Sequence, residues 1–150
     1  GIPNYLIQAS LSGVMAQRLV RTLCTHCKQP MPEEDRHTLH TLLQQYVQTL
    51  GDKDPIKQKL LDLTQRATLY HPQGCSHCRQ TGYHGRTGVY ELLTVTTTFR
   101  KAIAQQAGLE ELSQLALHEG MTPLRLAALA EVLQGNTSLS EALDCTSDWQ

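Results

Sequence analysis

LCTHCKQP at residues 23–30 and GCSHCRQT at residues 74–81 are near copies of one another. Each holds two cysteines three positions apart, with a histidine before the second cysteine. A C-x-x-C turn brings two thiolates together from a few residues of backbone, and two such turns supply the four ligands of a tetrahedral structural zinc site. We therefore predict that one zinc ion is bound by Cys24, Cys27, Cys75 and Cys78.

Two other interpretations of the cysteine pairs stay open. A redox C-x-x-C pair needs one thiol of low pKa, commonly at the start of a helix in a thioredoxin-like unit, and no such pattern precedes either pair. Buried thiols without metal are the second alternative. Because four thiolates close the shell of a zinc ion, a catalytic zinc with an open position is not expected. His26 and His77 are then surplus as ligands, and we expect both at the solvent edge.

The composition narrows the class of protein. Thirteen Lys and Arg against fourteen Asp and Glu give the 150 residues a formal charge of -1, so no overall field attracts nucleic acid or anionic lipid. The segment from Arg79 to Arg86 is weakly basic and contains Tyr83, which keeps a nucleic-acid-binding zinc module as an alternative. No apolar run approaches the roughly 20 residues of a membrane helix, and no secretion signal is visible, so we expect a soluble chain that is not exported.

The hydrophobic periodicity predicts a mainly helical chain. Apolar residues recur three or four apart over residues 5–23, which predicts an amphipathic helix. Prolines and acids after Cys27 are typical of a helix start, and Leu39 to Leu50 mark one face of a helix that ends at Gly51. A second helix is predicted over residues 55–67. The glycines and β-branched residues of 82–93 favour a short β-hairpin beside the second cysteine pair.

The part of the chain after Thr96 is predicted to form three or four short helices. Gly108, Gly120 and Gly135 each follow an apolar stretch, as expected of helix C-caps, and Ser138 with Glu141 fits a capping box. The candidate core residues of this part are Leu112, Leu115, Leu124, Leu129, Val132 and Leu143.

These elements predict a mainly α fold in three segments. Residues 1–23 are expected to be a helix that continues from an upstream domain. Residues 24–93 are expected to be a zinc-binding subdomain with a short β-hairpin and a helical insert at about 33–67. Residues 96–150 are expected to be a helical C-terminal subdomain. The zinc subdomain is too small to bury much core alone, so metal binding is expected to supply much of its folding energy.

Motifs of catalysis are absent from these 150 residues. There is no G-x-x-x-x-G-K-[ST] phosphate loop, no G-x-G-x-x-G, no H-E-x-x-H and no G-x-S-x-G. The chain therefore looks like a module without a catalytic site of its own.

Three stretches carry a resemblance to a known family: LIQASLSGVMAQRLVRTLCTHC, GCSHCRQTGYHGRTGVYELL and LQGNTSLSEAL. In this order they resemble the C-terminal part of the type II secretion and type IV pilus assembly ATPases (GspE/PilB-like). The resemblance implies the end of a cytoplasmic, homo-hexameric motor, with ATP and Mg²⁺ bound only in an upstream domain. It also implies partners: neighbouring subunits and an inner-membrane platform protein, which would hold the motor at the inner membrane.

The resemblance assigns positions as well. The four cysteines match the family's zinc ligands. Arg86 matches the arginine of a G-R-T-G segment and is a candidate for the nucleotide region or a subunit interface, although charge balance for an anionic zinc–thiolate centre explains it equally well. Arg18, in AQRL, is a similar candidate. The chain departs from the family pattern at residues 126–128 and 144–145, and its linker between the cysteine pairs is longer.

The function expected from these observations is mechanical. The module would couple the motion of the upstream motor to a platform protein or to the adjacent subunit, in protein secretion or pilus assembly. A stand-alone nucleic-acid-binding zinc module and a C-x-x-C thiol redox protein are the alternatives.

Overall fold

The computed structural model describes residues 1–49, 60, 62, 64 and 68–146, and helices predominate among them. Contacts between residues divide the chain into two compact units, one of residues 1–17 and 90–123 and the other of residues 18–89 and 124–150. In chain order the elements are α1 (Asn4–Ser10), β1 (Gly13–Leu23), β2 (Gln29–Pro30), α2 (Glu33–Thr49), β3 (Tyr70–His71), η1 (Ser76–Cys78), β4 (Tyr83–Thr94), α4 (Thr97–Ala104), α5 (Leu109–His118), α6 (Leu124–Leu133) and α7 (Leu139–Asp144).

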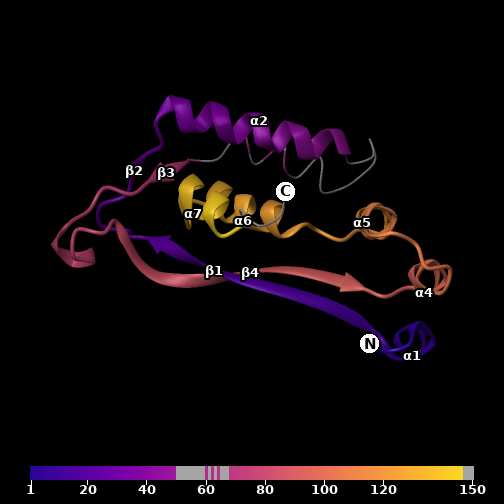
Figure 1. Cartoon of the computed structure of the whole chain (residues 1–150). Coiled ribbons are helices and arrows are strands. Elements are labelled where there is room, and N and C mark those ends of the chain that lie inside the picture. Colours follow the sequence, from indigo (N-terminus) through magenta and orange to yellow (C-terminus); the bar gives the residue numbers. More distant parts are fainter. Residues whose placement is uncertain (50–59, 61, 63, 65–67, 147–150) are drawn as a thin grey trace. The chain divides into compact units, whose positions relative to one another are not determined.

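Strands β1 and β4 pair with each other and run in opposite directions (Figure 1). The predicted helix over 5–23 is therefore wrong beyond Ser10, because residues 13–23 are a strand. Val14 and Leu19, which fitted a buried helical face, are about half exposed, whereas Val20 and Leu23 are buried. A distant partner strand overrides local periodicity here, since strand formation depends on cross-strand packing more than on the segment itself.

The predicted hairpin over 82–93 is also corrected. Residues 83–94 form the single long strand β4, and its partner is β1 instead of a second arm of the same segment. A short antiparallel pair does occur between β2 and β3, with Gln29 opposite His71 and Pro30 opposite Tyr70. Gly82 and Gly85 have positive φ near the start of β4, and the chain does not reverse its direction there.

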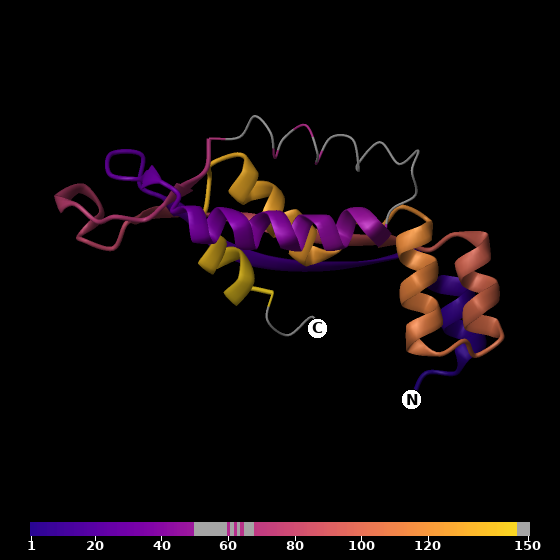
Figure 2. The same cartoon turned by 90° about the horizontal axis from the view of Figure 1, so that it is seen from above.

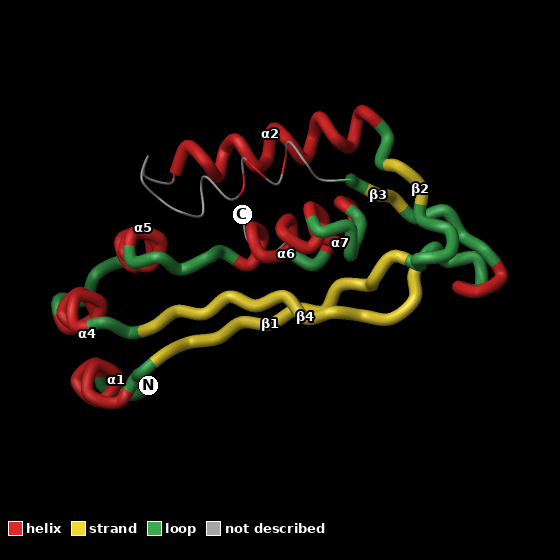
Figure 3. The backbone as a smooth tube through the Cα atoms, turned by 180° about the vertical axis from the view of Figure 1, so that it is seen from behind, coloured by secondary structure: helices red, strands yellow, loops and turns green. Residues whose placement is uncertain are grey.

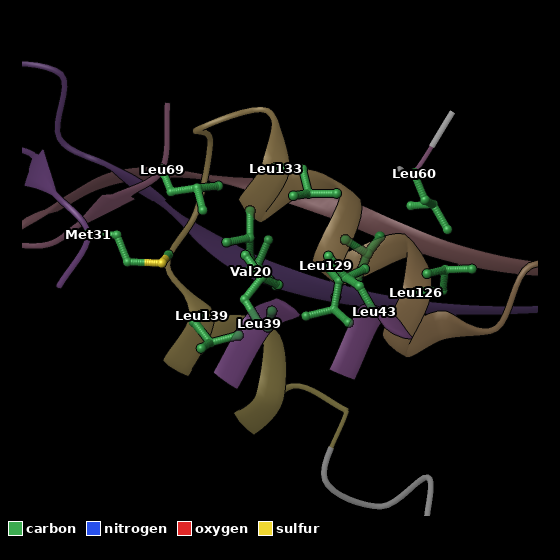
Figure 4. Packing of buried hydrophobic residues seen from close by; sticks show 14 of the residues in the cluster. Val20, Met31, Leu39, Leu43, Leu60, Leu69, Leu126, Leu129, Leu133 and Leu139 are labelled. Carbon is green, nitrogen blue, oxygen red and sulfur yellow. The ribbon is translucent and has the colours of Figure 1, made fainter. Parts of the chain in front are cut away.

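The unit of residues 18–89 and 124–150 is layered. Helices α6 and α7 lie between α2 and the ribbon of β1 and β4, and α6 packs against both α7 and α2 (Figure 1). Figure 4 shows that Val20 of β1, Leu39 and Leu43 of α2, and Leu129 of α6 meet in its centre, each at most 2% exposed. The predicted helix after Cys27 is thus confirmed from Glu33 to Thr49.

The end of that helix and most of the predicted helix over 55–67 lie outside the described residues. Of the second helix, residues 60, 62 and 64 are described, and they are helical. Leu60 is buried in the same core as α2.

The unit of residues 1–17 and 90–123 has its own small core of Val95, Phe99 and Ala116. Helix α1 packs on α4, and α4 packs on α5 (Figure 2). Thr96 caps α4: its hydroxyl oxygen accepts from the Phe99 N–H at 3.1 Å. Residues 90–123 therefore assemble with the N-terminal residues.

The predicted C-terminal helices are confirmed as four, but they do not share one unit. α4 and α5 belong to the first unit and α6 and α7 to the second, which differs from the single segment 96–150 expected from the sequence. Gly120 and Gly135 have positive φ after their helices, as predicted, whereas Gly108 is the N-cap of α5 with φ -68°. Leu124, Leu129 and Val132 are buried. Leu112, Leu115 and Leu143 are partly buried.

None of the helices in the described part of the chain has the length and apolar content that crossing a bilayer requires.

Candidate metal centre

The two C-x-x-C turns bring their four sulfur atoms together at one end of the β1–β4 ribbon. One turn follows β1, and the other precedes β4; their loops lie side by side in Figure 3. All four Sγ atoms lie within 4.8 Å of one another. Cys24, Cys27 and Cys78 are buried, and Cys75 is partly buried. Residues 51 positions apart in the sequence therefore converge, as predicted.

The spacing of the sulfurs fits a tetrahedral metal shell. Three of the sulfur–sulfur distances are 3.7 Å (Cys75 to Cys78), 3.8 Å (Cys27 to Cys78) and 4.0 Å (Cys24 to Cys75). A tetrahedron with zinc–sulfur bonds of about 2.3 Å has edges of about 3.8 Å. A disulfide would need about 2.05 Å, so these cysteines are not paired covalently. The cluster is the size of a four-thiolate zinc site.

The two turns share one backbone hydrogen bond between their cysteines, as their repeated sequence suggests. The N–H of Cys27 donates to the carbonyl of Cys24 at 3.3 Å, and the N–H of Cys78 donates to that of Cys75 at 3.2 Å. The Cys24 N–H donates to the Gly82 carbonyl at 2.9 Å and so joins the first turn to the end of the second. The position of the sulfurs is therefore set by backbone hydrogen bonds.

Amide groups also point at one of the sulfurs. The N–H groups of Cys75 and Gly82 each donate to the Sγ of Cys78 at 3.2 Å. Burial opposes a charge on Cys78, but these amide hydrogen bonds outweigh it and lower the pKa of the thiol to about 6. Burial raises the pKa of Cys27 to about 12, with the other thiols adding to the rise. Four neighbouring thiolates need a cation to be stable together.

Gly82 is a residue of this site that the sequence did not single out. Its φ is +78°, and a Cβ added to it would lie 2.5 Å from the Cβ of Pro72. Its N–H binds Cys78 and its carbonyl binds Cys24, so one glycine contacts both turns. The glycine is visible after the second cysteine pair, but its role depends on the approach of Pro72, which the sequence does not reveal.

The histidines of the two turns lie at the solvent edge, as predicted. His26 and His77 are exposed, and their ring centroids are 4.0 Å apart. His84 lies next in the row, 5.2 Å from His77. Within the described ranges, the one group of side chains with metal-binding spacing consists of the four cysteines.

Lys28 and Arg21 connect the first turn to the C-terminal helices, and nothing in the sequence predicts either connection. Lys28 Nζ donates to the carbonyl of Gly135 at 3.0 Å and lies 4.1 Å from the ring centroid of Tyr70. Arg21 Nε donates to Glu141 Oε1 at 2.8 Å. The end of β1 is thus fixed to the turn before α7 and to α7 itself.

Tyr83 extends this network from the second turn. Its ring lies under the guanidinium of Arg21, 4.2 Å from the centroid, and its hydroxyl lies 2.7 Å from the Ser138 hydroxyl. Ser138 is the N-cap of α7 and accepts from the Glu141 N–H at 3.2 Å. The capping box is therefore half formed, because the Glu141 carboxylate binds Arg21.

Residues 1–144 match the family described as Type II/IV secretion system protein. The chain belongs to this family. The match covers β1, both cysteine turns, β4 and all of the C-terminal helices, so the resemblance predicted from three separate stretches is confirmed.

Individual relatives agree with the family match. The chain is 37% identical over 143 residues to the type IV pilus assembly ATPase TfpB of Acinetobacter baylyi, which covers 95% of the chain and 22% of that protein. It is 36% identical over 149 residues to type II secretion system protein E of Aeromonas hydrophila, which covers 99% of the chain and 26% of that protein. It is 37% identical over 143 residues to the type IV pilus assembly ATPase PilB of Thermus thermophilus, which covers 95% of the chain and 14% of that protein. The chain therefore spans about a quarter or less of these relatives.

The two arginines that the family resemblance proposed lie on the strands of this secretion-family chain. Arg18 is exposed on β1. Burial raises the pKa of the Cys145 thiol, and the positive charge of Arg18 partly opposes that rise. Arg86 is exposed on β4. No described hydrogen bond joins either guanidinium to a cysteine sulfur. Their roles at a nucleotide or subunit interface stay predictions.

Proposed function

We propose that the chain is the C-terminal module of an ATP-driven motor of protein secretion or type IV pilus assembly, held together by one structural zinc ion. ATP and Mg²⁺ would bind an upstream domain of the parent protein. The module would work in the cytoplasm, at the inner membrane, in a homo-hexamer. Its task would be to pass motion to neighbouring subunits or to a membrane platform protein.

The observation that carries the proposal is the convergence of Cys24, Cys27, Cys75 and Cys78 within 4.8 Å in a chain of this family. Soft thiolate ligands in a tetrahedral arrangement favour zinc over hard cations such as Mg²⁺. Four thiolates leave no position for water, so the metal would stabilise the structure and take no part in a reaction.

The surroundings of the cysteines explain how such a metal would serve a mechanical role. The ion would fix the end of β1 to the start of β4. Lys28 and Arg21 then fix the same region to the turn at Gly135 and to α7. A force applied to the cysteine loops would therefore be transmitted to the core of the unit through these hydrogen bonds.

The two alternatives have less support. The homologues do not favour a stand-alone nucleic-acid module or a thiol redox protein. The relatives that align with 95% or more of this chain are named as secretion and pilus assembly proteins.

Metal content tests the zinc assignment. Purified chain should contain one zinc per molecule by elemental analysis, and Co²⁺ should bind in its place with the absorption of tetrahedral cobalt–thiolate. Cys27→Ser should lower the zinc content and shift the cobalt spectrum. Cys145→Ser is the matched control and should change neither, because that thiol lies on the far end of α7. Protein free of zinc after purification in zinc-containing medium would overturn the assignment.

The coupling role is tested in the full-length parent protein. Cys27→Ser and Cys78→Ser should leave ATP binding by the upstream domain intact while reducing hexamer formation, ATP turnover and secretion or piliation. Cys145→Ser should behave as the parent. Unimpaired export or piliation in the two ligand variants, with zinc absent, would contradict a mechanical role for the module.

A further inference from the structure

A shallow hollow of about 420 Å³ lies beside the second cysteine turn, within the unit of residues 18–89 and 124–150. It is lined by Arg21, Thr81, Tyr83, Gly85 and Arg86. Two arginines therefore line it, and no acidic residue is among its lining residues.

The surrounding chain is basic although the whole chain is not. Residues 18–32 and 68–89 contain no Asp or Glu but hold Arg18, Arg21, Lys28, Arg79 and Arg86. Acids approach from α7: Glu141 binds Arg21, and Asp144 also raises the pKa of Arg21 through its charge. Both of these acids act on Arg21.

The two arginines of the hollow differ in their bonding. Arg21 is held by Glu141 through Nε and Nη2, with its guanidinium 4.2 Å from the Tyr83 ring centroid. Arg86 is exposed, and among the described residues nothing forms a hydrogen bond or ion pair with its guanidinium. Arg21 is thus bound to Glu141, whereas Arg86 has no such partner among the described residues.

Gly85 lines the hollow and has a backbone conformation that favours glycine. Its φ is +85°, and a Cβ there would meet only the Thr22 hydroxyl oxygen, at 3.9 Å.

We propose that this hollow binds a carboxylate side chain from an acidic peptide segment of a partner protein. The planar fork of Arg86 suits a carboxylate in a bidentate pair. A single carboxylate matches the one arginine of the hollow that has no hydrogen-bond or ion-pair partner among the described residues, whereas a doubly charged phosphate would keep part of its charge uncompensated. That the partner protein belongs to a secretion or pilus machine rests on the proposed function; the binding of a carboxylate by Arg86 does not.

Binding of a fluorescent acidic peptide tests the proposal on the whole chain. A Glu- and Asp-rich peptide should bind in an anisotropy titration at low salt. Arg86→Ala should weaken binding about tenfold, in the range expected for loss of a charged hydrogen-bonded pair. Arg86→Lys should recover only part of the loss, because lysine cannot form the bidentate pair. A Gln and Asn version of the peptide should not bind.

Arg79→Ala is the matched control, since it removes the same charge from an exposed arginine that does not line the hollow. It should change the affinity less than twofold. Equal losses in Arg79→Ala and Arg86→Ala would show a diffuse charge effect and overturn the proposal. Inorganic phosphate or phosphatidylglycerol vesicles binding in an Arg86-dependent manner, with no peptide binding, would assign the hollow to a different ligand.

Zinc content measured on the same variants separates this proposal from the previous one. Arg86→Ala should keep its zinc while losing the peptide. If the chain binds no zinc and the peptide still depends on Arg86, only the zinc assignment fails. If zinc is present and the peptide is indifferent to Arg86, only the hollow's assignment fails.

Discussion

Arg21 and Glu141 are 120 positions apart in the sequence and are joined through both the backbone and the side chain of the arginine. The Arg21 N–H donates to Glu141 Oε2 at 2.9 Å, and its Nε donates to Oε1 at 2.8 Å. The carboxylate side chain is 13% exposed and the arginine side chain 54% exposed. One acid of α7 therefore holds the strand that leads into the first cysteine turn.

Glu141→Gln should destabilise the unit that contains the cysteine turns by about 1–2 kcal/mol, since hydrogen bonds to charged groups are worth more than neutral ones and the exposed arginine reduces the gain. Urea unfolding followed by circular dichroism measures the change. Glu110→Gln, on an exposed position of α5, is the control and should shift stability by about 0.5 kcal/mol or less. Equal effects of the two variants would contradict a special role for Glu141.

The contribution of this pair should depend on pH in a defined direction. Burial opposes ionisation of Glu141, but the hydrogen bonds from the Arg21 side chain and backbone outweigh it, so the pKa of the carboxyl is lowered in the folded protein. The stabilisation is then fully present above the unfolded carboxyl pKa of about 4.3 and is lost as pH falls through the lower folded value.

The stability difference between the parent chain and Glu141→Gln, measured from pH 7 to pH 3, reports this dependence. It should be constant near neutral pH and shrink below about pH 4, because glutamine does not titrate. A difference that grows with acidity would show that the pKa is raised instead.

The two cysteine turns could be predicted from the sequence because their geometry is local. Each C-x-x-C turn closes within a few residues, and the repeated motif indicates that the two belong together. Helix α2 was predictable for the same reason: Leu39 and Leu43 are spaced for one helical face, and both are buried.

Strand β1 could not be predicted because its structure depends on a distant partner. The apolar residues of 13–23 fit a helical period, but pairing with β4 satisfies the backbone of both segments. Arg21 and Lys28 likewise gave no sign of their partners, Glu141 and Gly135, which lie more than 100 positions away. The division of the C-terminal helices between two units follows from contacts with residues 1–17, also distant in sequence.

Gly82→Ala should weaken metal binding at least tenfold, the range seen when groups supporting metal ligands are removed. Alanine there would bring its Cβ within 2.5 Å of Pro72 Cβ, and relief of that clash would displace the amide that donates to Cys78. Competition for zinc with a chromophoric chelator measures the affinity.

Gly120→Ala is the matched control for that substitution. Gly120 also has a positive φ, +95°, but a Cβ there would meet nothing within 4 Å. The control should lower stability through backbone strain while leaving zinc affinity unchanged. A similar loss of affinity in both variants would mean that Gly82 acts through global stability.

Chelation of the proposed zinc should loosen the unit of residues 18–89 and 124–150 and leave the other unit folded. The sequence predicted that residues 96–150 form a subdomain separate from the zinc site, but α6 shares its core with Val20 and with Leu39 of α2. Hydrogen exchange with and without a strong chelator should therefore show lost protection in the cysteine turns, β2 and β3, and smaller losses in α6 and α7. Helices α4 and α5 pack around Phe99 and Ala116 in a separate core and should keep their protection. Uniform loss across all helices would show one cooperative unit, and no loss in the cysteine turns would show that the metal does not hold them.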